Sequence, residues 1–194
     1  MKKIILSLIS LILLTGCAVK KGPDLHPNAS GKTINNMPKW FINPPKKEGF
    51  RYNAATATSQ DMQMALDKAR TSATTVLVGL IESEYNALVK RAQEETGLGP
   101  ESEIIDQFSS TQEQVISKKL SDISIYEQTV QDERTTKGRI YRAYVLVEFN
   151  EDAANERLLA QIKSNEKIYT AIRATELFEE MEEKVNNYRK RYSQ

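Results

Sequence analysis

The strongest pattern of apolar and polar positions lies between Arg139 and Phe149, a run of β-branched and aromatic residues that predicts a strand. Every second residue of this run shares one face, which we expect to be core: Tyr141, Ala143, Val145, Val147 and Phe149. Two weaker patterns predict further strands. One is Arg51–Ala57, whose small residues let a helix approach closely, and the other is Asp122–Val130, whose alternation is imperfect. The segment Arg134–Gly138 predicts the hairpin turn before the strongest strand.

Between the first two predicted strands, apolar residues recur at steps of three and four, which is the spacing of an α-helix. We expect a long helix from about Ser59 to Glu95, with a capping box at Thr58–Asp61 before it and the breakers Thr96–Pro100 after it. Its predicted inward stripe is Met62, Leu66, Ala69, Ala73, Val76, Leu80 and Leu88, and close packing on the sheet is predicted for Ala65, Ala69 and Ala73. A shorter helix is expected from about Glu101 to Lys119, with the inward residues Ile104, Phe108, Thr111 and Val115.

The last part of the chain predicts one more helix, capped at Asn150 and running to about Tyr192, which at 1.5 Å per residue is about 60 Å long. Its apolar stripe changes phase, from Leu158, Ile162, Tyr169 and Ile172 to Phe178, Met181, Val185, Tyr188 and Tyr192 at heptad spacing. Such a seam needs a partner, which is either the distal part of the first helix or another subunit. The candidate partner-binding residues here are Phe178, Met181, Val185 and Tyr188.

The first residues follow another pattern, because Lys2 and Lys3 precede the apolar run Ile4–Leu14. A bilayer crossing takes about 20 apolar residues, so this run is too short to be a transmembrane helix. A short apolar run between a positive start and small residues is typical of a secretory signal peptide. Its removal takes away two lysines and no acid, so the formal net charge of +1 becomes −1.

The end of this segment, Leu14-Thr15-Gly16-Cys17, resembles a bacterial lipobox. Small side chains at Thr15 and Gly16 let a peptidase approach the backbone, and the Cys17 thiol is the nucleophile that accepts a diacylglyceryl group. We expect cleavage between Gly16 and Cys17, a covalent diacylglyceryl and N-acyl lipid at Cys17, and no other cofactor. One acyl chain anchors a protein marginally, whereas two or more anchor it stably. The alternative is an ordinary signal peptide that happens to carry a cysteine. Ala18, not Asp, comes next, which favours the outer membrane by resemblance to enteric sorting rules.

Residues 18–47 predict a tether, since five of the six prolines fall there. A flexible coil of about 30 residues has a root-mean-square span of about 30 Å, which would hold a domain clear of a membrane. The lone histidine, His26, has no acidic or cysteine neighbour at ligand spacing, so no metal or catalytic role is expected for it.

One apolar group interrupts this tether, at Trp40, Phe41 and Ile42. Such side chains are costly to leave in water, so we expect them to dock onto the folded domain as its first packed element. The alternative is a contact with a membrane interface or a partner, which makes Trp40 a further candidate partner-binding residue.

Together these patterns predict an α+β fold, with a small antiparallel-type sheet of about three strands packed on long helices and a long C-terminal helix. The predicted divisions are a lipoprotein signal peptide at 1–16, a lipidated cysteine and tether at 17–47, an α+β domain at 48–149 and the long helix at 150–194.

Composition and motifs give little sign of catalysis. The 27 basic residues balance 26 acidic ones, so no basic field gathers nucleic acid, and a single cysteine excludes an internal disulfide. The sequence contains no glycine-rich phosphate loop, no Cys-His spacing for zinc and no Gly-x-Ser-x-Gly elbow. We therefore expect no enzyme activity, no metal site and no small-molecule substrate. A hydrolase with paired carboxylates is the enzymatic alternative, although the acids occur in helical surface runs.

Several motifs together resemble the LPP-twenty family of small bacterial outer-membrane lipoproteins. They are the lipobox at Cys17, the Pro38-Lys-Trp40 entry, the Tyr52–Ala57 strand followed by Met64–Ala69, and the Tyr141–Val147 strand. The resemblance covers residues 38–149 and implies an envelope protein without enzymatic activity, to which no catalytic residue can be carried over. One branch of the family builds a lipoprotein disc around the flagellar motor in the periplasm, and others are surface antigens.

The resulting functional hypothesis is a lipid-anchored envelope protein with a structural or assembly role. It would sit on the outer membrane facing the periplasm, and would bind a second copy of itself or an envelope partner, for example a flagellar one. The alternative hypothesis is a periplasmic binding or regulatory lipoprotein that acts on peptidoglycan or its synthases.

Overall fold

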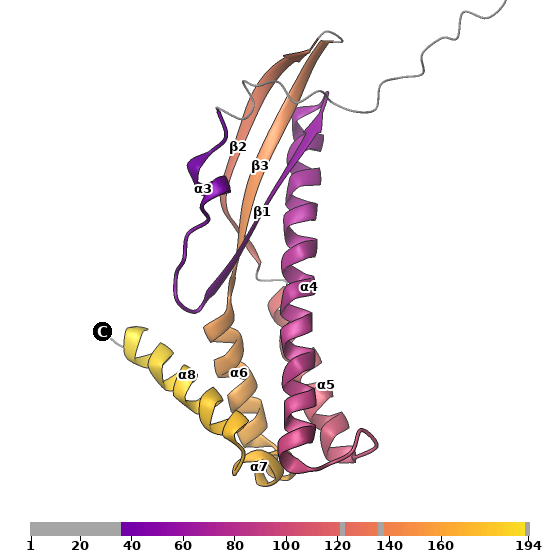
Figure 1. Ribbon diagram of the computed structural model, residues 1–194, viewed down its shortest axis with the longest axis vertical. Coiled ribbons are helices and arrows are strands. Elements are labelled where there is room, and N and C mark those ends of the chain that lie inside the picture. Colours follow the sequence, from indigo (N-terminus) through magenta and orange to yellow (C-terminus); the bar gives the residue numbers. More distant parts are fainter. Residues whose placement is uncertain (1–35, 121–122, 136–137, 193–194) are drawn as a thin grey trace, which may run out of the picture. The chain divides into compact units, whose positions relative to one another are not determined.

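A computed structural model describes residues 36–120, 123–135 and 138–192, and the described elements belong to one compact unit, Met37–Gln194 (Figure 1). The predicted signal peptide, Cys17 and His26 lie outside the described residues. The fold is α+β, as predicted, with a three-stranded antiparallel sheet and six helices in the described part of the chain.

The sheet has the strand order β1-β3-β2, so the strongest predicted strand lies at its centre. The strands are β1 (Phe50–Ser59), β2 (Ser124–Thr135) and β3 (Gly138–Asn150). Val145 and Val147 of β3 are buried on one face, and Tyr144 and Leu146 are buried on the other, so the central strand is covered on both sides. The imperfect alternation predicted near the start of β2 corresponds to a register shift between Ile125 and Glu127.

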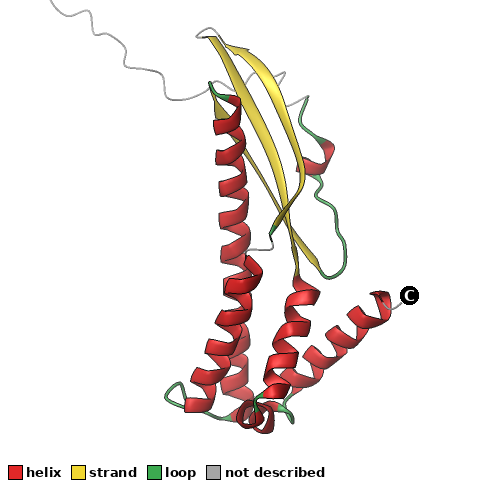
Figure 2. Cartoon of the chain, turned by 180° about the vertical axis from the view of Figure 1, so that it is seen from behind, coloured by secondary structure: helices red, strands yellow, loops and turns green. Residues whose placement is uncertain are grey.

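One face of the sheet is covered by α4 (Met62–Thr96), the longest helix (Figures 1 and 2). The predicted alanine packing is confirmed, because Ala65, Ala69 and Ala73 are fully buried. The rest of the predicted stripe is wrong in phase: Met62, Val76 and Leu80 are about half exposed. The buried stripe advances in steps of four as far as Tyr85, so it drifts around the helix as it passes from the sheet to the other helices. Its residues are Ala65, Ala69, Ala73, Leu77, Ile81, Tyr85 and, seven positions further on, Ala92.

The ends of α4 agree with the predicted boundaries, although one cap differs. Asp61 was expected as the acid three residues after the N-cap in a capping box. It is itself the N-cap, and its side chain accepts a 2.7 Å hydrogen bond from the Met64 N–H. At the other end Gly97 adopts a left-handed φ of 70° and its N–H donates to the Gln93 carbonyl at 2.9 Å.

Beyond the end of the sheet, the lower half of α4 packs with four further helices (Figures 1 and 2). They are α5 (Glu103–Leu120), α6 (Glu151–Ser164), α7 (Glu166–Ile172) and α8 (Glu176–Tyr192). Phe108 and Val115 of α5 are buried as predicted, whereas the other buried residues of that helix are Ile105, Gln112 and Ile116 in place of Ile104 and Thr111.

A long C-terminal helix is present as α8, but the prediction of one unbroken helix from Asn150 to Tyr192 is wrong. The chain breaks at Asn165, whose side chain caps α7 by accepting from the Ile168 N–H, and again before α8 at Thr175. Both residues are good helix caps. The breaks allow α8 to fold back on α6, so its apolar seam is buried within the chain.

The short helix α3 (Lys39–Ile42) carries the apolar group of the predicted tether. Phe41 meets the ring of Tyr144 edge-on at a centroid distance of 5.0 Å, on the sheet face opposite α4 (Figure 1). Trp40 contacts Phe41 at 6.2 Å and is half-buried, while Ile42 is exposed. This docking agrees with the first of the two expectations for the segment.

Candidate functional site

The first candidate site is a cleft of about 190 Å³ where the start of β1 meets α4, α6 and α8. Its apolar part is formed by Tyr85, Leu88, Leu177 and Met181. Its polar lining consists of Arg51, Glu84, Glu151, Asn155, Glu180 and Lys184. Apolar walls with a few charged groups are typical of binding sites, so the partners of each charge decide what the cleft can do.

The charges at the β1 end of the cleft are paired with one another. The Arg51 Nε donates to Glu151 Oε2 at 2.6 Å, and its terminal nitrogen lies 3.1 Å from Glu84 Oε1. The hydrogen bond to Glu151 raises the pKa of Arg51, so the guanidinium stays charged. Burial raises the pKa of Tyr85, whose hydroxyl lies 3.4 Å from Asn155 Oδ1. The contacts of Arg51 therefore hold β1 against α4 and α6.

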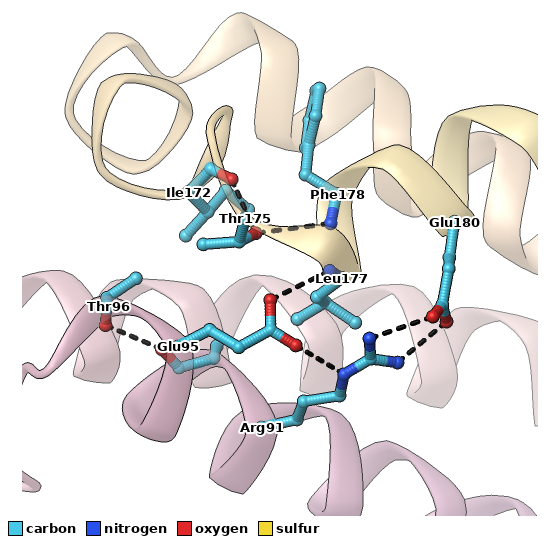
Figure 3. Close-up of polar contacts among 9 residues, drawn as sticks. Arg91, Glu95, Thr96, Ile172, Thr175, Leu177, Phe178 and Glu180 are labelled. Atoms are coloured by element: carbon cyan, nitrogen blue, oxygen red, sulfur yellow. Dashed lines mark hydrogen bonds and ion pairs between the residues drawn. The ribbon is translucent and has the colours of Figure 1, made fainter.

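Glu180, which lines the cleft, belongs to a clasp that we define as Arg91, Glu95 and Glu180 (Figure 3). Arg91 binds the Glu180 carboxylate with two hydrogen bonds of 2.7 and 2.9 Å, and its Nε donates to Glu95 Oε1 at 2.5 Å. The other Glu95 oxygen accepts from the Leu177 N–H at 2.9 Å. A carboxylate of α4 therefore satisfies a free backbone N–H in the first turn of α8.

The clasp acts together with the cap of α8. The Thr175 hydroxyl accepts from the Phe178 N–H at 3.2 Å and donates to the Ile172 carbonyl at 2.6 Å (Figure 3). The Leu177 hydrogen bond, and after it Arg91, lowers the pKa of Glu95, while Arg91 lowers the pKa of Glu180. Both carboxylates remain charged at neutral pH and serve to hold α8 on α4.

The rest of α8 is attached mainly to α6 by ion pairs. They are Lys163 with Glu182 at 2.5 Å, Arg189 with Glu156 at 2.7 Å, and Arg191 with Asp152 and Glu48. Burial raises the pKa of Asp152, and the charge of Arg191 opposes this effect. The polar groups around α8 therefore fix the position of a helix.

A second concave surface of about 340 Å³ lies between α5 and α6. It is lined by Gln114, Val115, Lys118, Arg157, Ala160 and Gln161. The lining contains two cationic and two amide side chains and no acid, so its chemistry suits an anionic, hydroxyl-rich ligand.

The predicted partner-binding residues differ in how deeply they are buried. Phe178, Met181 and Val185 are buried within the chain, so they form no free surface for another subunit. The seam packs within the chain, mainly against α6 and in part against α4, so the partner predicted in the first long helix supplies only part of the contact. Tyr188 is half-buried against the Tyr192 ring at 4.9 Å, and Trp40 lies on α3. Gly16 and Cys17 lie outside the described residues.

Two kinds of feature are absent from the described residues. They contain no group of three or more His, Cys, Asp or Glu side chains that could hold a metal ion. Within the same residues, no helix is long and apolar enough to span a bilayer.

Sequence reasoning missed the clasp. Its charges belong to two helices separated by more than 80 positions, and each looks like an ordinary surface charge. The one local signal was the spacing of Arg91 and Glu95, four residues apart on the same face of α4.

A comparison of the chain with family models, with curated proteins and with solved structures finds no match.

Proposed function

We propose that this chain is a lipid-anchored protein of the bacterial cell envelope with a structural or assembly role and no enzymatic activity. The observation that carries the proposal is Leu14-Thr15-Gly16-Cys17 directly after a short apolar run. Cys17 would become the first residue of the mature protein and carry diacylglyceryl and N-acyl groups, which together give stable anchoring.

The compact unit supports this proposal through its position in the chain. It begins at Met37, so residues 18–36 separate it from the anchored cysteine. A coil of about 20 residues spans roughly 25 Å, which leaves room for a folded unit beside a membrane. The unit would face the periplasm from the outer membrane, and its partner would be a second copy or an envelope protein.

The chemistry of the cleft also favours an assembly role over catalysis. Its charged groups at Arg51, Glu84, Glu151 and Glu180 are paired with one another or with Arg91. Such pairs fix helices and strands in place, and a catalytic acid or base would instead need a pKa near the working pH. Membership of the LPP-twenty family, and a place in a flagellar complex, belong to the same proposal.

Substitution of the cysteine tests the anchor. Wild-type chain labelled with a palmitate analogue is expected in the membrane fraction with label attached, whereas Cys17→Ser is expected to lose both label and membrane association. Thr15→Ser, which keeps a small residue before the cleavage site, is the matched control and should behave as wild type. Recovery of Cys17→Ser in the membrane with full label would overturn the proposal.

A second candidate function, binding to peptidoglycan, is favoured by the surface between α5 and α6. Lys118 and Arg157 supply positive charge there, and Gln114 and Gln161 supply amides that can bind sugar hydroxyls. If this candidate is correct, the chain pellets with purified sacculi and Arg157→Glu weakens pelleting. If the chain stays in the supernatant, the candidate is removed.

A further inference from the structure

Residues 37–47 begin the compact unit, and we call them the strap. Near the start of the strap the Phe41 ring packs edge-on against Tyr144 of β3. At its end the Lys47 Nζ lies 4.0 Å from the centroid of the Phe50 ring in β1. The strap is therefore attached to the sheet at two points.

Both attachment points lie on the sheet face opposite α4. Thr56 of β1 pairs directly with Tyr144, so their side chains share one face. Phe50 lies on the same face, because it is six residues from Thr56 in a strand of regular register. Asn53, on the other face of β1, donates to the Ala73 carbonyl of α4 at 2.8 Å. The strap therefore lies on the side of the sheet away from α4 (Figures 1 and 2).

The strap is basic. It contains no acid, and its three cations are Lys39, Lys46 and Lys47. Around the axis of an α-helix Lys39 lies about 160° from Phe41, so it points away from the sheet. Lys46 is exposed as well. Glu48, the acid that follows the strap, is paired with an arginine of α8, so the strap keeps its positive charge.

The sheet face under the strap carries acids, which lie closer to the sheet than the strap lysines do. Glu133 is paired with Arg142 at 2.7 Å, with both side chains 13% exposed. Glu148 accepts a hydrogen bond from the Ser124 hydroxyl at 3.2 Å, while Glu127 is exposed on β2. A surface that rests on the strap meets the lysines first, and the strap separates it from these acids.

The strap and its surroundings also expose apolar side chains. Ile42 is 60% exposed, and Trp40 is half-buried. Tyr192 at the end of α8 is 54% exposed, and the Lys47 Nζ lies 6.0 Å from the centroid of its ring. Trp, Tyr and Lys side chains are typical of the boundary between lipid head groups and acyl chains. Lysines around such residues suit a bilayer with anionic head groups.

The position of the strap in the chain favours the membrane that would hold the anchor. Residues 18–36 separate the strap from Cys17, and a coil of about 20 residues spans roughly 25 Å. The strap is thus the part of the unit nearest to the anchor along the chain. Head groups around the anchor would be present at high local concentration, so weak individual attractions are sufficient.

We propose that the strap is the surface through which the folded unit rests on an anionic lipid bilayer. Phe41 stays docked on the sheet, and the exposed side chains of the strap contact the head groups. The acyl groups of the anchor hold the protein, whereas the strap sets its orientation, with α4 away from the membrane. This inference rests on the lipid anchor of the proposed function and names the side of the unit that faces the lipid.

Trp40 is the only tryptophan of the chain, so its fluorescence reports on the strap. The full-length lipidated chain would be reconstituted into vesicles with brominated acyl chains, which quench tryptophan at short range, and compared with the same vesicles without bromine. Phosphatidylglycerol in the vesicles is expected to make quenching at least about twofold stronger than in phosphatidylcholine alone. Equal quenching in both kinds of vesicle would overturn the proposal.

Two double variants with the same change in net charge locate the contact. Lys39→Glu combined with Lys46→Glu reverses charge on the strap and is expected to remove most of the extra quenching. Lys68→Glu combined with Arg70→Glu, at exposed positions of α4, is the matched control and should behave as wild type. Circular dichroism would establish that both fold. An equal loss of quenching in both would contradict a contact at the strap.

The outcomes separate this inference from the anchor on which it rests. A lipidated chain that floats with the vesicles while Trp40 stays unquenched keeps the anchor and overturns the strap contact. A chain isolated without lipid at Cys17 overturns both. Ile42→Cys that reacts with a water-soluble maleimide in vesicles, but is protected in native membranes, would assign the strap to a protein partner and overturn the lipid contact.

Discussion

At the scale of single residues, Gly49 is the glycine of the described segments that tolerates a side chain least. It precedes β1 with a φ of 76°, its carbonyl accepts the Glu151 N–H at 2.9 Å, and a Cβ there would lie 1.8 Å from Asp152 Oδ2. A positive φ and a carboxylate in the same space both exclude other residues. Gly49 therefore fixes how the chain passes the N-terminus of α6.

This geometry predicts opposite effects for two glycine substitutions. Gly49→Ala is expected to destabilise the fold by about 1–3 kcal/mol, because it combines backbone strain with a steric clash. Gly79→Ala, in an exposed helical turn with open space around it, is expected to stabilise by about 0.5–1 kcal/mol. Urea unfolding of both variants measures the difference, and equal stabilities would contradict the assigned environments.

The buried stripe of α4 makes a second prediction at this scale. Leu77 is 1% exposed and Leu80 is 55% exposed, although they lie one turn apart on the same helix. Leu77→Ala is expected to cost about 2–5 kcal/mol, because it removes buried atoms and leaves a cavity. Leu80→Ala should change the free energy of unfolding by less than about 0.5 kcal/mol at concentrations where the chain is monomeric. If Leu80→Ala lowered the free energy of unfolding more than Leu77→Ala, the buried stripe predicted from sequence would be correct and the one described here wrong.

That stripe shows what residue patterns can and cannot predict. A period of three to four identifies α4 as a helix and places its ends within a few residues. The small residues Ala65, Ala69 and Ala73 were predicted to pack closely, but the pattern could not show that Val76 and Leu80 are exposed. Hydrophobicity ranks the larger side chains higher, whereas the close contact with the sheet selects the smaller ones.

At the scale of elements, the clasp formed by Arg91, Glu95 and Glu180 joins α4 to α8. Glu95→Gln removes the charge that accepts the Leu177 N–H and pairs with Arg91. Loss of such a capping interaction typically costs about 1 kcal/mol. The amides of α8 are therefore expected to exchange faster in Glu95→Gln at pH 7, as measured by hydrogen exchange. Glu94→Gln, one residue away on the exposed surface, is the matched control and should match wild type.

The role of Glu95 in the clasp also predicts a pH dependence. The folded-state pKa of Glu95 is lowered from 4.5, so its contribution to stability is present above pH 4.5 and is lost as the pH falls through the folded value. The difference in unfolding free energy between wild type and Glu95→Gln should therefore be largest near pH 7 and shrink below pH 4.5. A difference that grows in acid would contradict the assigned role.

Elements with strong local signals were predictable, and those fixed by distant contacts were not. The run in β3 and the glycine after α4 predict a strand and a helix end on their own. The breaks at Asn165 and Thr175 were missed, because an apolar heptad continues on both sides of them. Their caps become favourable only when α8 can bury Phe178 and Met181 against the chain's own helices.

At the scale of the whole molecule, the proposed account joins a lipid anchor and a folded unit that begins at Met37. The first part comes from sequence alone, since Cys17 lies outside the described residues. The exposure of Met62, Val76 and Leu80 could be seen only in three dimensions. The sequence pattern had instead assigned these three residues to the core.

The lipid at Cys17 is the central claim of this account, and mass spectrometry of the mature N-terminus tests it most directly. The chain isolated from bacterial membranes is expected to begin at Cys17, with the added mass of one diacylglyceryl and one N-acyl group and with residues 1–16 absent. An N-terminal peptide that retains residues 1–16, or that contains an unmodified Cys17, would contradict the account.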